Sequence, residues 1–170
     1  MTAHFSPFDP RRDLVLQRDI AVPRDRVWAA WTEPERLKRW FTPAPWQTVD
    51  VEVDLRPGGI FRTVMRSPEG VDQPPNLGCY LDIVPGERLV WTSLMEPGYR
   101  PAAPVADGGC HGLQFTAVIT LQDHAGGTRY RALVMHPDED SARRHEEMGF
   151  SEGWGTTLDQ LVALYGGSRN

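Results

Sequence analysis

Six short strand-like runs between residues 48 and 136 constrain the fold more than any other feature. Apolar and polar side chains alternate in them with a period of two, which is typical of strands with one buried face. The runs cover residues 48–55, 60–66, 78–84, 89–95, 113–121 and 128–136. Turn signals such as Pro57-Gly58-Gly59 and Pro85-Gly86-Glu87 separate neighbouring runs, so the sequence predicts a largely consecutive antiparallel sheet.

A long amphipathic helix is predicted after this sheet, starting at about Phe150. Its apolar side chains recur at helical spacing and form one face: Phe150, Trp154, Leu158, Leu161, Val162 and Tyr165. Gly153 and Gly155 interrupt this helix, and each lowers helix propensity by about 1 kcal/mol relative to alanine. Their presence indicates either close packing at this end of the helix or room for something else there.

The N-terminal part predicts one strand and two short helices. The strand covers residues 14–21 and ends before Pro23. Asp25 or a nearby residue is expected to cap the first helix. Thr32-Glu33-Pro34-Glu35 has the pattern of a capping box, which predicts the start of a second helix. Bulky side chains expected to point inward from these helices are Val27, Trp28, Trp31, Leu37, Trp40 and Phe41.

Two further segments interrupt the strand rhythm. Residues 96–112 are rich in Pro, Gly and Ala and have no period, so we expect a long loop over one end of the sheet, of the kind that acts as a lid. Residues 138–145 place acidic side chains in a first helical turn and basic ones in the last, which predicts a short helix. Gly149 is expected to end or bend it.

Length and charge limit the classes of function. A chain of 170 residues with 40% apolar side chains can form one core, so a single domain is expected over residues 14–165, between a flexible segment (1–13) and a tail (166–170). The net charge of -5, without a basic cluster, argues against nucleic acid as a partner. Without a secretory or membrane-spanning apolar run, we expect a cytoplasmic protein that does not insert into membranes.

Spaced motifs between residues 14 and 164 carry a family resemblance. They include Trp31-Thr32-Glu33-Pro34, Trp40-Phe41, Arg56-Pro57-Gly58-Gly59, Ile83-Val84-Pro85-Gly86-Glu87 and Gly149-Phe150 with Gly153-Trp154. In this order they resemble the START-like (SRPBCC) superfamily, and most closely the stand-alone domains similar to the C-terminal domain of the activator of the heat-shock-protein-ninety ATPase. The resemblance implies an α+β helix-grip fold of order β-α-α-β6-α, whose curved antiparallel sheet wraps around the C-terminal helix.

The resemblance also implies a central hydrophobic cavity, because members of the superfamily hold a lipid, a polyketide or another apolar molecule between sheet and helix. The aromatic and apolar side chains that would line this cavity can equally be ordinary residues of the hydrophobic core. No metal or cofactor is expected. The residues expected to bind the ligand are Trp40, Phe61, Met65, Tyr80, Trp91, Phe115, His136, Phe150, Trp154 and Leu158.

His136 is the main candidate for acid–base chemistry, because a histidine titrates near neutral pH. It comes at the end of the last predicted strand, on the same face as Tyr130. The alternative to a catalytic role is a histidine that only forms hydrogen bonds at the strand end. Glu146 is its candidate carboxylate partner. A metal site built from Cys110, His111, His136 and Glu146 lacks paired ligand spacing, and Cys110 as a nucleophile activated by His111 lacks an orienting group. Arg62 and Arg66 alternate with Phe61 and Met65 and are expected in solvent; the alternative is an inward arginine that anchors an acidic group of the ligand.

Three functions stay open at this point. The first is binding of a small hydrophobic ligand, with Tyr80 and His136 as polar anchors and residues 96–112 as a lid. The second is a cyclase- or hydrolase-type enzyme in which His136 and Glu146 move protons on such a ligand. The third is a co-chaperone-like stimulator of a chaperone ATPase in a stress response, although that activator carries an additional N-terminal domain which we do not expect here. A homodimer formed through a sheet edge is also expected.

Overall fold

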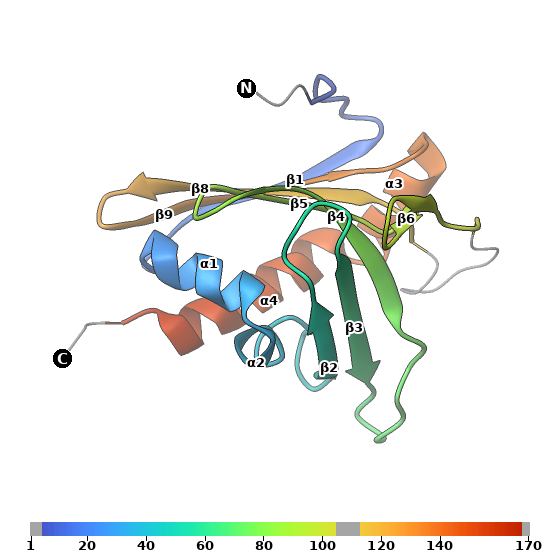
Figure 1. Cartoon of the computed structure of the whole chain (residues 1–170). Helices are drawn as coiled ribbons and strands as arrows, with labels where there is room; N and C mark the ends of the chain where they lie inside the picture. Colours follow the sequence, from blue (N-terminus) through green and yellow to red (C-terminus); the bar gives the residue numbers. More distant parts are fainter. Residues whose placement is uncertain (1–4, 105–112, 168–170) are drawn as a thin grey trace.

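A curled antiparallel sheet and a long C-terminal helix dominate the structure, a computed structural model that describes residues 5–104 and 113–167 (Figure 1). The sheet has seven strands in the order β1-β9-β8-β5-β4-β3-β2. Helix α4 (Phe150–Tyr165) lies along its concave face. The strands are β1 (Asp13–Ile20), β2 (Gln47–Val53), β3 (Ile60–Arg66), β4 (Asn76–Val84), β5 (Arg88–Thr92), β8 (Thr116–His124) and β9 (Gly127–Met135). The predicted α+β helix-grip fold is confirmed.

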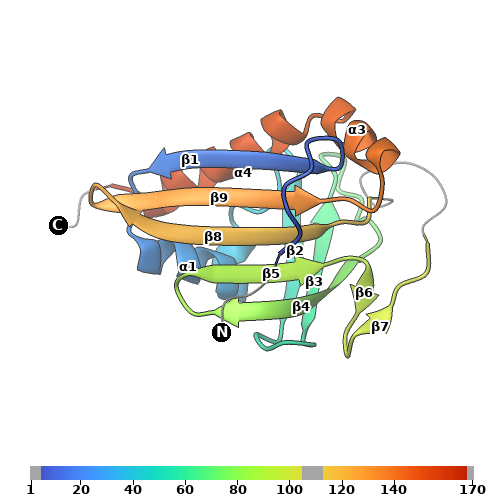
Figure 2. The same ribbon diagram turned by 90° about the horizontal axis from the view of Figure 1, so that it is seen from above.

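The curl of the sheet leaves space beside α4. Figure 2 shows β2 and β3 turned steeply away from the direction of β1, β9 and β8. The register shifts between Thr48 and Asp50 in β2 and between Tyr80 and Asp82 in β4. Because an extra residue in one strand bends it and increases its twist, these irregularities help the sheet to curve into a half-barrel.

The six predicted strands are all present, with one difference. The run at residues 89–95 divides into β5 and the two-residue strand β6 (Met95–Glu96), which pairs with β7 (Arg100–Pro101) in a separate small sheet. The predicted 96–112 loop therefore starts with a short hairpin. Its remaining part at 105–112 lies outside the described residues.

Three further helices were predicted and are present: α1 (Arg24–Thr32), α2 (Pro34–Leu37) and α3 (Glu139–Glu147). Two capping predictions were wrong. Thr32 is the last residue of α1 and its hydroxyl donates back to the Trp28 carbonyl at 2.8 Å, so it is not free to cap α2. Asp25 lies inside the first turn of α1. At α3, the Asp138 side chain accepts a hydrogen bond from the Ser141 N–H at 2.7 Å.

The core lies between the concave face, α1 and α4. Trp31 and Trp40 pack edge to face with ring centroids 5.0 Å apart, and the Trp40 indole N–H donates to the Ala30 carbonyl at 2.9 Å. None of the helices in the described part of the chain has the length and apolar character that crossing a bilayer requires. Within the predicted flexible segment 1–13, Asp9 forms a hydrogen-bonded turn with Arg12 and Asp13 that leads into β1.

Candidate ligand-binding site

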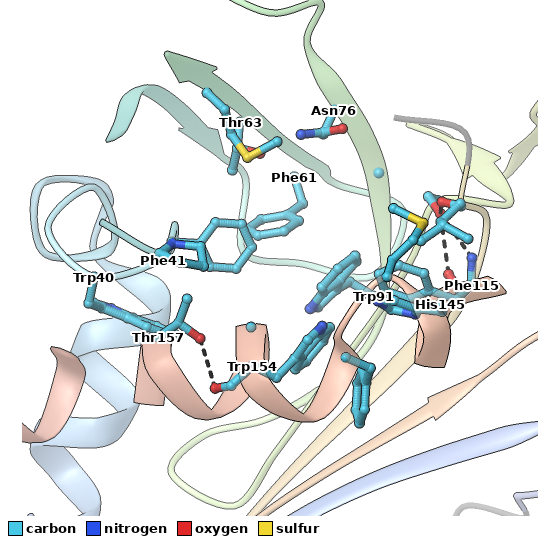
Figure 3. Close-up of a pocket in the computed structure, with 18 of the residues that line it drawn as sticks. Trp40, Phe41, Phe61, Thr63, Asn76, Trp91, Phe115, His145, Trp154 and Thr157 are labelled. Carbon is cyan, nitrogen blue, oxygen red and sulfur yellow. Dashed lines mark hydrogen bonds between the residues drawn. The ribbon is translucent and has the colours of Figure 1, made fainter. Parts of the chain in front are cut away.

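A cavity of about 330 Å³ lies between the concave face of the sheet and the N-terminal half of α4 (Figure 3). Its volume falls in the range of small-molecule sites. Strands β3, β4, β5 and β9, helices α1 and α4, the segment that follows α2, the residues just before β8 and the corner between α3 and α4 supply its wall. The larger lining side chains are Trp31, Trp40, Phe41, Phe61, Met65, Leu77, Trp91, Leu113, Phe115, Tyr130, His145, Met148, Phe150 and Trp154.

Aromatic rings form a continuous part of this wall. Phe41 contacts Phe61 at 5.7 Å between centroids, and Phe61 contacts Trp91 at 4.9 Å. Phe115 continues the series, 5.4 Å from Trp91 and 6.0 Å from Trp154. Tilted and edge-to-face arrangements of this kind hold the rings in place and present apolar faces to the interior.

Charged side chains are absent from the described lining of the cavity, which contains no Asp, Glu, Lys or Arg. The polar lining residues are Thr63, Asn76, Ser93, His145 and Thr157. The predicted outward position of Arg62 and Arg66 is confirmed, because they pair with Asp50 at 2.6 Å and Asp72 at 2.5 Å on the other face. The cavity therefore suits an uncharged occupant.

Seven of the ten predicted binding residues line the cavity: Trp40, Phe61, Met65, Trp91, Phe115, Phe150 and Trp154. Their role in binding stays a prediction. Tyr80, Leu158 and His136 do not line it. Tyr80 is fully buried beside Phe61, burial raises the pKa of its hydroxyl, and that hydroxyl has no partner among the described residues. The Tyr80 hydroxyl is thus not placed to anchor a ligand.

His136 is buried one layer behind the cavity wall. Its Nδ1 lies 2.8 Å from the Arg12 carbonyl oxygen and its Nε2 lies 3.0 Å from Nδ1 of His145. The expected pairing with Glu146 is wrong, because Glu146 is exposed on α3 while its neighbour His145 faces the sheet. Successive helical residues point about 100° apart, so only one of the two can face inward.

Among the lining residues that the sequence analysis did not predict, His145 is the one with acid–base chemistry. The sequence pattern identifies it only as a basic residue in the last turn of a helix. The signal that could have found it is its spacing of three from Ala142, since both lie on the buried side of α3.

Burial keeps both histidines neutral. Desolvation and, as the smaller cause, the neighbouring His136 together lower the pKa of His145 to about 4. Desolvation also lowers the pKa of His136, against the opposing effects of the Arg12 carbonyl and of the carboxylates of Asp13 and Asp138. At neutral pH the pair is therefore uncharged.

In residues 5–104 and 113–167, no three His, Cys, Asp or Glu side chains come together as metal ligands would. Cys110 and His111 lie outside the described residues, and so do the nucleophile and two of the four ligands considered for a metal site.

The two glycines near the start of α4 predicted either close packing or open space, and each alternative applies to one of them. A Cβ atom at Gly155 would lie 2.6 Å from Nη2 of Arg18, so this glycine allows close packing of α4 on β1. A Cβ atom at Gly153 would meet nothing within 4 Å, and Gly153 lines the cavity. The absent side chain at Gly153 thus leaves room inside the site.

A curved antiparallel sheet that grips a C-terminal helix around an apolar cavity defines a helix-grip protein of the START-like class. The comparison with known families agrees with this architecture. The pattern of the family described as "Activator of Hsp90 ATPase homolog 1-like protein" matches residues 21–166, so the chain belongs to this family. Among curated proteins, none matches this chain.

Several solved structures are similar to this chain. A crystal structure of a Nitrosomonas europaea protein is 51% identical, with 92% of this chain and 96% of that chain covered and a TM-score of 0.84. A Mycobacterium smegmatis protein is 21% identical, with 94% of each chain covered and a TM-score of 0.73. A Chromobacterium violaceum protein is 24% identical, with 92% and 99% covered and a TM-score of 0.71. The last two similarities concern the fold alone.

Proposed function

We propose that this protein binds a small, uncharged hydrophobic molecule, such as a lipid, a polyketide or another aromatic metabolite, in the cavity between the sheet and α4. The observation that carries the proposal is the combination of a cavity of about 330 Å³ with an aromatic wall and no charged side chain among its described lining residues. A cavity of this size and lining is typical of sites that bury most of a small ligand.

The position of Gly153 supports the same function. A core that only needed to be filled would gain stability from a side chain here, because apolar atoms pack to high density in protein interiors. The glycine instead keeps open space on the face of α4 that looks into the cavity.

Native mass spectrometry of the protein purified from its own host tests the proposal. We expect a defined adduct at near-stoichiometric occupancy, released on denaturation. Gly153→Phe should abolish the adduct, because its ring would occupy the cavity. Thr156→Phe is the matched control, since Thr156 is exposed on α4 and its ring would point to solvent. Clean apoprotein that also takes up none of a panel of lipids and aromatic compounds contradicts the proposal.

An enzyme of the cyclase or hydrolase type is the second candidate, and the observation that favours it is a neutral histidine in the cavity wall. His145 has a second histidine behind it, as an acid–base group supported by a partner would. Turnover of a bound polyketide-like compound that is lost in His145→Phe, while binding is kept, would favour the enzyme over the binding protein.

A co-chaperone role is the third candidate, favoured by the family match over residues 21–166. This role depends on the surface of the protein and not on its cavity. Stimulation of a chaperone ATPase that Gly153→Phe leaves unchanged would support it.

A further inference from the structure

The buried histidine pair connects the cavity wall to the N-terminal segment. His136 contacts the Arg12 carbonyl oxygen twice, through its backbone N–H at 3.0 Å and through Nδ1 at 2.8 Å. Its other ring nitrogen, Nε2, lies 3.0 Å from Nδ1 of His145, and His145 lines the cavity. A chain of hydrogen bonds thus runs from the backbone before β1 to the wall of the site.

When both rings are neutral, the hydrogen atoms in this series of hydrogen bonds can be placed in only one way. A carbonyl oxygen only accepts, so Nδ1 of His136 must carry the hydrogen. Nε2 of His136 is then an acceptor, and the hydrogen on the shared contact must come from Nδ1 of His145. A neutral imidazole has one N–H, so Nε2 of His145 carries no hydrogen and is an acceptor.

The surroundings of His145 hold its ring in this orientation. Phe115 stacks on the ring at 5.2 Å with an interplanar angle of 26°, and Phe150 packs against it edge to face at 5.1 Å. The side chain is about nine-tenths buried, and Nε2 has no hydrogen-bond partner among the described residues. Nδ1 and Nε2 lie on different edges of the imidazole, so the contact with His136 leaves Nε2 unoccupied. Figure 3 shows His145 beside Phe115 at one end of the site.

An unused acceptor in an apolar, uncharged cavity favours an uncharged group that donates a hydrogen bond. An amine or guanidinium would bring a charge that no described lining side chain balances. A carbonyl or ether oxygen could not donate a hydrogen. A hydroxyl group on an apolar molecule can donate to the nitrogen while the rest of the molecule packs on the aromatic wall.

We propose that Nε2 of His145 accepts a hydrogen bond from a hydroxyl group of the ligand, so that the cavity selects uncharged hydroxyl-bearing molecules with an apolar ring system. His136 is a positioning residue that sets the tautomer of His145 through the Arg12 carbonyl. This inference rests on the proposed binding function and deepens it by naming the group that the site recognises.

A pair of probes that differ only in the hydrogen-bond donor tests the inference. 2-Naphthol and 2-methoxynaphthalene share a ring system and are both uncharged at pH 7, but only the first can donate. Isothermal titration calorimetry of the full chain should show 2-naphthol binding about fivefold to tenfold more tightly, the ratio expected for one net hydrogen bond. His145→Phe should bring the ratio close to one and leave the affinity for 2-methoxynaphthalene within about twofold.

The role of His136 needs a readout that a loss of packing would not change. His136→Phe should also lower the ratio of the two affinities, because the proton on His145 is no longer directed to Nδ1. Nitrogen NMR of the wild-type protein reads the tautomer directly: Nε2 of His145 should be the unprotonated nitrogen, and 2-naphthol should shift its resonance while 2-methoxynaphthalene does not. This measurement decides the question even where a variant fails to fold.

Each outcome separates the two proposals. Equal affinities for the two probes, or a protonated Nε2 in the wild type, would overturn the hydroxyl inference and leave the binding function standing. Binding of neither probe nor any compound of the panel would overturn both. A preference for 2-naphthol that His145→Phe does not change would place the hydroxyl elsewhere in the cavity and overturn the inference.

Discussion

Gly153 and Gly155 lie two residues apart on α4 and meet opposite surroundings. Nothing lies within 4 Å of the position that a Cβ atom would take at Gly153, whereas the corresponding atom at Gly155 would lie 2.6 Å from Nη2 of Arg18. That arginine also forms an ion pair with Asp159 at 2.8 Å. One glycine thus leaves space in the cavity, and the other lets α4 approach β1.

Gly153→Ala should stabilise the protein by up to about 1 kcal/mol, because alanine has the higher helix propensity and its methyl group meets no atom. Gly155→Ala should give no such gain, since Arg18 must move and its hydrogen bond to the Gly155 carbonyl is disturbed. Urea unfolding of the two variants checks this. Equal shifts of the two midpoints would show that the space at Gly153 is not present in solution.

Gln160 holds the segment that carries Trp40 and Phe41 into the cavity. Its Nε2 donates to the carbonyls of Trp40 at 3.0 Å and Thr42 at 2.9 Å, and its Oε1 accepts from the Ala44 N–H at 2.8 Å. Gln160→Glu keeps the acceptor, removes both donors and sets a carboxylate against two carbonyl oxygens. We expect a loss of about 2 kcal/mol in the free energy of unfolding.

Asp159→Asn is the matched control for Gln160→Glu. It changes the neighbouring side chain and weakens an exposed ion pair with Arg18, so its cost should stay under about 1 kcal/mol. Calorimetric unfolding of both variants measures the difference, and a similar cost for the two would exclude a special role for Gln160.

The histidine pair should make stability fall as the pH is lowered through the range from 6.5 to 4. The folded state holds the pKa of His145 at about 4, below its ordinary value of 6.5, so the unfolded chain binds more protons in this interval and stability rises with pH. The loss for His145 is on the order of 3 kcal/mol. His136 adds in the same direction, while Asp13 and Asp138 oppose its shift.

Urea unfolding at several pH values checks this dependence, with His145→Phe as the comparison. The variant should lose most of the slope between pH 6.5 and 4. The ion-paired surface carboxylates whose pKa is lowered below 3.8, such as Asp19 and Asp50, contribute below this window in both proteins. An unchanged slope in the variant would mean that His145 is protonated in the folded protein.

Tyr80→Phe should stabilise the protein by about 1 kcal/mol, because the hydroxyl that it removes is buried without a partner among the described residues. Tyr165→Phe should have the opposite sign, since the Tyr165 hydroxyl donates to the Arg36 carbonyl at 3.1 Å. Thermal unfolding measures both. Destabilisation by Tyr80→Phe would show that its hydroxyl is hydrogen-bonded in solution.

Local patterns determined the elements of this protein and much of its cavity wall. The period-two runs, the turns that separate them and the apolar stripe of α4 predict the sheet and the terminal helix, because alternation and helical spacing depend only on neighbours in the chain. The same alternation places Phe61 and Met65 on one face of β3 and Arg62 and Arg66 on the other. The family resemblance of the spaced motifs then predicted the helix-grip fold.

Only the tertiary structure decided how those faces meet. Thr32 fits a capping box as a local pattern, but α1 continues through it and uses its hydroxyl. The packing of α3 on the sheet turned His145 inward and left Glu146 in solvent, and so set the partner of His136. The curl of the sheet left Tyr80 behind the cavity wall. The face that a helix turns toward the sheet and the curvature of the sheet both depend on contacts between residues far apart in the chain. Spacing between neighbours in the sequence carries no information on these contacts.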